Sequence, residues 1–206
     1  ALVGPVPMPL VASLDVLATA GIAVAVTVPI VRGRHWQHLG MIGKVILLVP
    51  ANLIFYLGLF GVWSSGTKVG LYLGFYTVLA LILAMGRRVI PFFIERGVGC
   101  PFQARRQVWL DRLSLGLFLP FAAADILAMS AAWSGAAPLA AVLALVQVPL
   151  HGLRLHGWHH REIWRKPLLW VLFLAYGWVI VGLALKALTL VLPLAPFIPL
   201  HAMAIG

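Results

Sequence analysis

The chain has 206 residues, of which 63% are apolar and 10% charged, with 15 Lys and Arg against 5 Asp and Glu. Soluble globular domains have about 45–50% apolar and about 25% charged residues, so this composition excludes an ordinary water-soluble fold. The formal charge of +10 does not indicate nucleic-acid binding, because the cations lie between apolar stretches and not on a water-soluble basic domain. We therefore expect an integral membrane protein with no nucleic-acid partner.

Six apolar stretches are long enough to cross a lipid bilayer. A helix of about 20 apolar residues spans a hydrocarbon core of about 30 Å, where every backbone N–H and C=O must be bonded internally. The predicted spans, in chain order, are 10–31, 39–63, 68–85, 108–133, 136–153 and 167–191. Residues 196–206 are predicted to begin a seventh span, and 87–107 to form a loop broken by Pro91 and Pro101. We expect an all-α bundle that forms one transmembrane domain over 1–206, as part of a larger protein.

Basic residues alternate between the loops. Thirteen of the fifteen Lys and Arg residues lie in or beside the loops 32–44, 87–112 and 154–166. The other two, Lys68 and Lys186, lie near the opposite ends of their spans. By the positive-inside rule, the three basic loops are predicted to be cytoplasmic and the first span to begin at the outer face.

Three glycines at four-residue spacing, Gly66, Gly70 and Gly74, lie at the start of the third predicted span. Small residues at this spacing let the backbone of a second membrane helix approach closely. We therefore predict that another helix packs against this face.

Two carboxylates lie within predicted spans, where an ionisable group costs about 2.5–3.5 kcal/mol on insertion scales. Asp15 is about five and Asp125 about eight residues from the outer end of its span, which places both at outer-leaflet depth. Uncharged polar residues also lie within the predicted spans, namely Asn52, Tyr56, Tyr72, Tyr76 and Tyr176. Together they either line a polar cavity in the outer half of the bundle or only bond helices to one another. Asp111 lies at the cytoplasmic end, where we expect an ion pair with Arg112.

The histidines differ in their predicted depth. His201 is the one near the outer face, and His151 lies near the inner end of the fifth span. Imidazole binds haem iron, copper and zinc, so His201 is the main metal-ligand candidate and His151 a weaker one. A site at His201 needs Met203, an acid, or a ligand from elsewhere. The pairs His35/His38 and His156/His160 have helical ligand spacing, but the Arg, Lys and Trp around them favour residues at the headgroup level.

Five segments, taken in order, resemble the NnrS family. They are MGRRVIPFFIERG (85–97), WLDRLSLGLFLPFAAAD (109–125), LHGLRLHGW (150–158), PLLWVLFLAYGWVIVGLAL (167–185) and LHAMAIG (200–206). The similarity extends from the Leu14-Asp15 pair over almost the whole chain, and it is the ordered set that makes it specific. Two positions depart from the family pattern: many members have glycine in place of Arg87 and histidine in place of Phe173.

The resemblance implies a bacterial inner-membrane protein of about twelve spans that contains haem and copper. It also implies a link to nitric oxide metabolism and to resistance to nitrosative stress, with nitric oxide as a ligand. His201, Asp15 and Asp125 fall on positions characteristic of the family, and we hypothesise that His201 ligates haem or copper, with Asp15 and Asp125 as neighbouring or proton-path groups. Arg88 would hold a haem propionate, a lipid phosphate or Asp111, and Tyr176 falls on a characteristic position.

Two other functional classes remain open, and it is undecided whether the protein is an enzyme. A transporter would use the same buried acids, with Pro50, Pro120 and Pro149 as hinges. A structural or assembly subunit of a respiratory complex would need neither acid, so Asp15→Asn and Asp125→Asn would leave its function intact.

Overall fold

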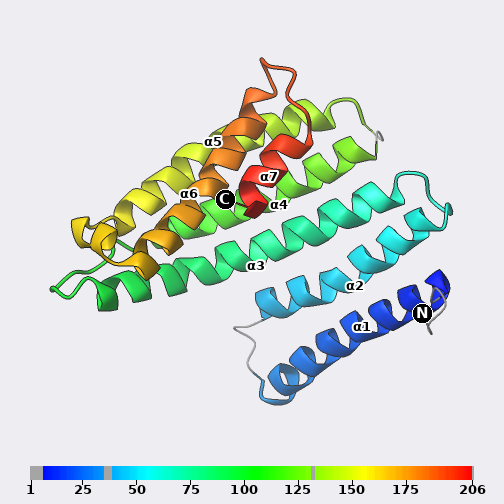
Figure 1. Ribbon diagram of the computed structural model, residues 1–206, viewed down its shortest axis with the longest axis horizontal. Helices are drawn as coiled ribbons and strands as arrows, with labels where there is room; N and C mark the ends of the chain where they lie inside the picture. Colours follow the sequence, from blue (N-terminus) through cyan, green and yellow to red (C-terminus); the bar gives the residue numbers. More distant parts are fainter. Residues whose placement is uncertain (1–6, 35–38, 131–132, 206) are drawn as a thin grey trace, which may run out of the picture. The chain divides into compact units, whose positions relative to one another are not determined.

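The structure, a computed structural model, describes residues 7–34, 39–130 and 133–205. These residues form helices and connecting turns, with no strand among them. The elements are α1 (Met8–Arg32), α2 (Leu39–Leu59), α3 (Gly66–Gly97), α4 (Val108–Met129), α5 (Ala136–Trp158), the short 3-10 helix η2 (Arg161–Arg165), α6 (Pro167–Leu188) and α7 (Phe197–Ile205) (Figure 1). The all-α prediction is confirmed.

The helices α1 to α6 are each long and apolar enough to cross a membrane, which confirms the six predicted spans. Their surfaces carry many large apolar side chains, for example Leu17 at 67% and Leu71 at 60% exposure. A soluble monomer rarely exposes extended apolar surface, whereas lipid chains would cover it. The chain is a multi-pass membrane protein. The nine-residue α7 lies within the predicted start of a seventh span.

Two helices continue beyond their predicted ends. The prediction of a loop from residue 87 is wrong, because α3 runs to Gly97 with Pro91 inside it. Ile90 and Ile94, four residues apart, are 7% and 0% exposed, so this helical stripe stays buried. Burial of that stripe favours the helix despite the backbone hydrogen bond lost at proline. Likewise α5 continues past residue 153 to Trp158.

The chain divides into two compact units, one of residues 1–81 and 129–132 and the other of residues 82–128 and 133–206. The expectation of a single transmembrane domain stays a prediction.

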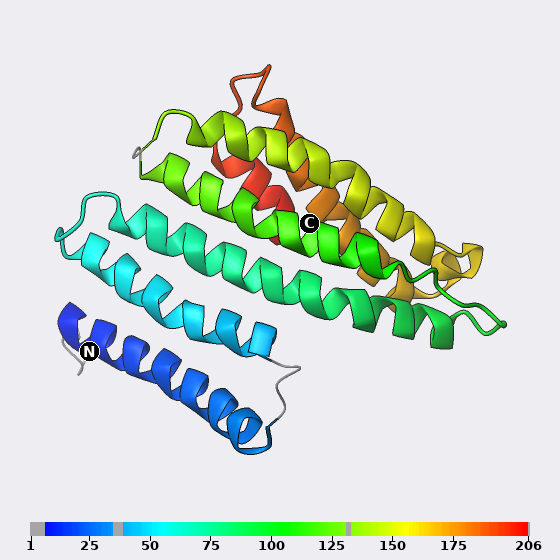
Figure 2. The ribbon, with the colours of Figure 1, turned by 180° about the vertical axis from the view of Figure 1, so that it is seen from behind.

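In the first unit, α1 and α2 lie side by side and run in opposite directions (Figures 1 and 2). A turn with Gly61 at a φ of +76° follows α2, a left-handed conformation that favours glycine. This turn explains why α2 ends at Leu59 and not at the predicted residue 63. On α3, a Cβ atom at Gly70 would lie 2.4 Å from the backbone N of Phe55. The predicted close helix packing is confirmed at this glycine.

In the second unit, α6 packs against both α5 and α7 (Figure 1). The side chains with the least exposure include Phe118, Phe121, Ile94, Ile163 and Leu183, all at 0–1%. At Gly182 of α6, a Cβ atom would lie 2.9 Å from the carbonyl oxygen of Pro199. Because glycine has no Cβ atom, Gly182 lets α6 and α7 lie close together. Gly70 does the same for α2 and α3.

Candidate functional site

The first polar cluster lies between α1 and α2, in the first unit. One carboxylate oxygen of Asp15 accepts hydrogen bonds from the Asn52 amide (3.1 Å) and from the Tyr56 hydroxyl (3.0 Å). The same amide donates to the Thr19 hydroxyl (3.0 Å). Asn52 and Tyr56 therefore point to one side of α2, as their spacing predicts. Asp15 remains exposed, so its carboxylate is both held in place and accessible.

The second cluster is an ion pair within the second unit, between Asp125 of α4 and Lys186 of α6. Their side chains are 2% and 10% exposed. Lys186 lies in the last turn of α6, as the sequence predicts, but its burial against Asp125 does not follow from the sequence. A carboxylate inside a span costs less when a cation neutralises it, and Lys186 is that cation.

The third cluster is a chain of polar side chains from α4 and α5 to α6. The buried imidazole of His151 lies with its Nδ1 atom 2.6 Å from the Tyr176 hydroxyl. Arg154 donates to the same hydroxyl (3.1 Å) and pairs with Asp111 at 2.8 Å. Arg87 of α3 lies 3.9 Å from the other oxygen of Asp111. The expected pair of Asp111 with Arg112 is therefore wrong, since Asp111 faces Arg154 and Arg87.

Three buried side-chain atoms of α5 have neither a hydrogen-bond nor an ion-pair partner among the described residues, namely His151 Nε2, Gln147 Oε1 and Arg154 Nε. The side chains of His151 and Gln147 are 0% exposed. Buried polar atoms are nearly always hydrogen-bonded in native proteins, and an exception often marks an unseen ligand or water. The Nε2 atom of His151 is therefore a candidate contact for a bound group.

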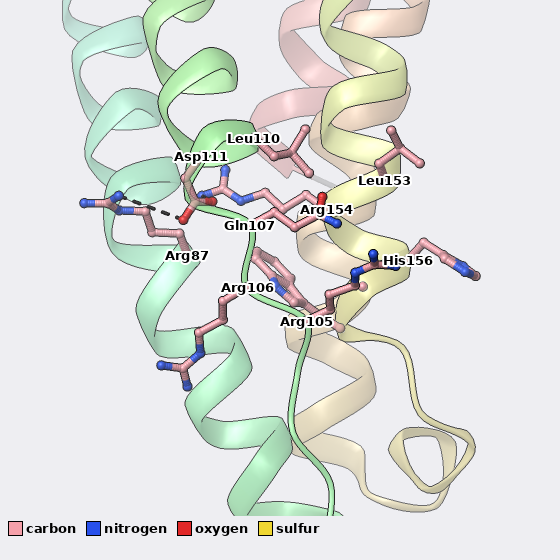
Figure 3. A pocket seen from close by; sticks show the side chains of 11 residues that line it. Arg87, Arg105, Arg106, Gln107, Leu110, Asp111, Leu153, Arg154 and His156 are labelled. Carbon is pink, nitrogen blue, oxygen red and sulfur yellow. Dashed lines mark ion pairs between the residues drawn. The ribbon is translucent and has the colours of Figure 1, made fainter.

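A small pocket of about 80 Å³ opens where this polar chain reaches the ends of the helices. The charged and titratable side chains that line it are Arg87, Arg105, Arg106, Asp111, Arg154 and His156. Figure 3 shows Asp111 between Arg87 and Arg154, with Arg105 turned toward α5 and Arg106 turned toward α3. Arg106 pairs there with Glu95 at 2.8 Å. The pocket thus has an excess of positive charge.

His201 lies on the exposed face of α7, and its Nδ1 atom is 2.9 Å from the carbonyl oxygen of Phe197. A carbonyl oxygen only accepts hydrogen bonds, so Nδ1 carries the proton and, in the neutral ring, Nε2 keeps its lone pair. Metal-bound histidines usually have this arrangement, in which the second ring nitrogen is fixed by a hydrogen bond. The described residues contain no group of three or more His, Cys, Asp or Glu side chains placed to hold a metal ion.

Comparison with known protein families matches the sequence to the family described as NnrS protein, over residues 1–206. The chain belongs to the NnrS family. Neither a curated protein nor a solved structure matches it.

Asp15, Asp125 and Tyr176, which the sequence places in one polar group, each have partners within their own unit. In this NnrS protein Asp125 pairs with Lys186, whereas Tyr176, in the same unit, bonds to His151 and Arg154. Asp15 has its own partners in the other unit. Each of these contacts joins two different helices, as the interpretation as helix-to-helix hydrogen bonding predicts, and the shared cavity stays a prediction.

Other predicted residues lie as follows in this NnrS chain. Arg88 is exposed on α3, and its neighbour Arg87 is the one beside Asp111. Met203 is 8% exposed and lies against Gly182 of α6, away from the exposed face that carries His201, so it is not placed as a ligand beside it. His160 lies beyond the end of α5, so it does not share a helical face with His156. His35 and His38 lie outside the described residues.

The sequence predicts Arg154 in a basic loop, whereas the structure buries it on α5. The signal was present, since Gln147, His151, Arg154 and Trp158 are spaced by four, three and four residues, which places them on one helical face. All four are 0–3% exposed.

Proposed function

We propose that this NnrS-family protein binds haem or copper and takes part in nitric oxide metabolism or in resistance to nitrosative stress. Family membership supports the proposal, and the observation that carries it is the arrangement of His201. Its Nδ1 atom is bonded to the backbone of α7 and its side chain is exposed, so Nε2 can bind a metal without rearrangement of the helix. Haem iron and copper accept such a ligand, and both bind small gaseous ligands such as nitric oxide.

His151 is the weaker metal candidate. Its Nε2 atom lacks a partner, and Tyr176 fixes its other ring nitrogen, which fits a ligand held by a neighbouring hydrogen bond. The ring is however 0% exposed, so a metal at Nε2 would have to be accommodated inside the packed second unit. We therefore rank His201 first.

The other residues would support the bound group by charge and hydrogen bonding. Arg88 is exposed on α3 and can pair with a carboxylate such as a haem propionate. Asp15 has an accessible carboxylate that is held by Asn52 and Tyr56, and it can hold a proton. Asp125 is neutralised by Lys186, which favours a structural contribution over proton transfer.

We expect the complete protein, purified in detergent, to show haem in its reduced-minus-oxidised absorption spectrum and copper by metal analysis. His201→Ala should lose one of the two, because no other histidine in the described part of α7 can replace its ligand. His156→Ala, an exposed histidine on α5, is the control and should retain both. A parent protein without metal would contradict the proposal.

Transport is the second candidate function. The buried pair of Asp125 and Lys186, and the polar chain from Asp111 to His151, are ionisable groups inside spans, where such groups often mark a pathway. Each of the helices α1 to α6 is continuous, however, whereas many secondary transporters bind substrate between broken half-helices. A metal-free parent protein whose function is lost in Asp125→Asn would favour transport over an assembly subunit.

A further inference from the structure

The pocket at the ends of α4 and α5 has more positive charge than its own acid can neutralise. Arg87 and Arg154 both face the single carboxylate of Asp111. Arg105 lines the same pocket and has no acidic partner among the residues that the structure describes. Two guanidinium groups therefore share one carboxylate and the third has no acid to neutralise it, which is the arrangement expected of a site for an anion.

The backbone holds Arg105 at this pocket. Its amide N–H donates to the carbonyl oxygen of Gly157 (2.9 Å), and a Cβ atom at Gly157 would lie 3.3 Å from the carbonyl oxygen of Arg105. The loop before α4 is thus docked closely on the last turn of α5. On the other side, Arg154 is 3% exposed and its Nε atom has no partner. A preformed backbone and an unsatisfied buried donor distinguish this pocket from a scatter of surface cations.

The size and the surroundings of the pocket indicate the class of anion. Sites for drug-sized ligands have volumes of about 300–1,000 Å³, so a pocket of about 80 Å³ holds only a small group. Leu153 lines it and is 57% exposed, and Trp109 near the start of α4 is also 57% exposed. Exposed leucine and tryptophan beside arginine at helix ends are typical of the membrane interface. A phosphate attached to acyl chains fits both the charge and the apolar border.

We propose that this pocket binds the phosphate group of an anionic phospholipid. Arg105 and Arg87 contact the phosphate oxygens, and the acyl chains run along Leu153. The buried Arg154 adds positive charge beside them. This site is separate from His201, so it does not depend on metal binding. Arg87 and Arg105, and not the exposed Arg88, are then the lipid-binding arginines.

The test is retention of phosphatidylglycerol by the complete protein, counted by native mass spectrometry in a mild detergent. Arg105→Gln should weaken retention more than about tenfold, because a hydrogen bond to a charged group contributes about 1.5–3 kcal/mol. Arg112→Gln is the matched control, since Arg112 is an exposed arginine of α4 that does not line the pocket. It should retain phosphatidylglycerol as the parent does, and phosphatidylcholine should be retained weakly by all three proteins.

Several outcomes would overturn the proposal. Equal retention by the parent and Arg105→Gln would do so, as would full displacement of the lipid by millimolar inorganic phosphate, which would make the pocket a site for a soluble anion. Loss of haem without loss of lipid in Arg105→Gln would assign the pocket to a cofactor carboxylate. If the variant does not fold, crosslinking of the parent protein with a photoreactive phosphatidylglycerol is the deciding test. Crosslinks confined to residues outside 84–91, 105–112 and 153–158 would contradict the site.

Discussion

Replacement of Lys186 by methionine is expected to destabilise the protein by about 3–5 kcal/mol, the cost of removing one partner of a buried ion pair. Asp125 and Lys186 are 2% and 8% exposed, and the ammonium group is paired with the carboxylate. Without Lys186 the buried carboxylate loses the cation that neutralises it. Thermal unfolding of the complete protein in detergent measures the loss.

The double variant Asp125→Leu/Lys186→Met separates the lost pair from lost packing. Replacement of both charges by apolar groups of similar volume is often neutral or stabilising, so the double variant should recover most of the stability. Lys68→Met is the matched control, because Lys68 is exposed on α3. The Lys68→Met variant should unfold at the same temperature as the parent. A double variant less stable than Lys186→Met would show that the two residues act independently.

The fold could be predicted largely from hydropathy, and the errors have a common cause. The predicted starts at Leu39, Val108, Ala136 and Pro167 coincide with the observed helix starts. The ends of α3 and α5 do not, because each helix continues into a basic segment after the apolar run stops. Hydropathy reports where lipid ends, whereas a helix ends where its backbone hydrogen bonds end. A turn with Gly61 in the left-handed conformation stops α2 earlier than the apolar run does.

The candidate site could be predicted only in part. The contact of Asn52 and Tyr56 with Asp15 follows from spacing within α2 and from the shared depth of the two spans. The partners of Asp125 and Asp111 do not follow, because they depend on how each helix is rotated about its own axis. Where a helix is apolar on all sides, its sequence pattern carries little information about that rotation. The burial of Lys186 and Arg154 therefore does not follow from the sequence pattern.

Replacement of Gly70 by alanine is expected to destabilise the first unit by about 1–3 kcal/mol, the usual cost of overpacking. The added Cβ would lie 2.4 Å from the backbone N of Phe55 and 2.7 Å from the carbonyl oxygen of Ala51. Backbone atoms cannot rotate away as a side chain can, so α2 and α3 would have to move apart locally. The unfolding temperature of the complete protein in detergent should fall.

Gly74→Ala is the control that isolates the close approach, because Gly74 lies one turn further along α3. Its added Cβ would lie 3.9 Å from the Cβ of Ala51, which is ordinary van der Waals contact. Both substitutions gain about 0.8–1.0 kcal/mol of helix propensity, so their difference reports the helix contact alone. If the two variants unfold at the same temperature, α2 and α3 do not approach closely at Gly70 in the membrane. A lower temperature for Gly70→Ala alone would show that the glycine spacing acts at Gly70 and not equally along the stripe.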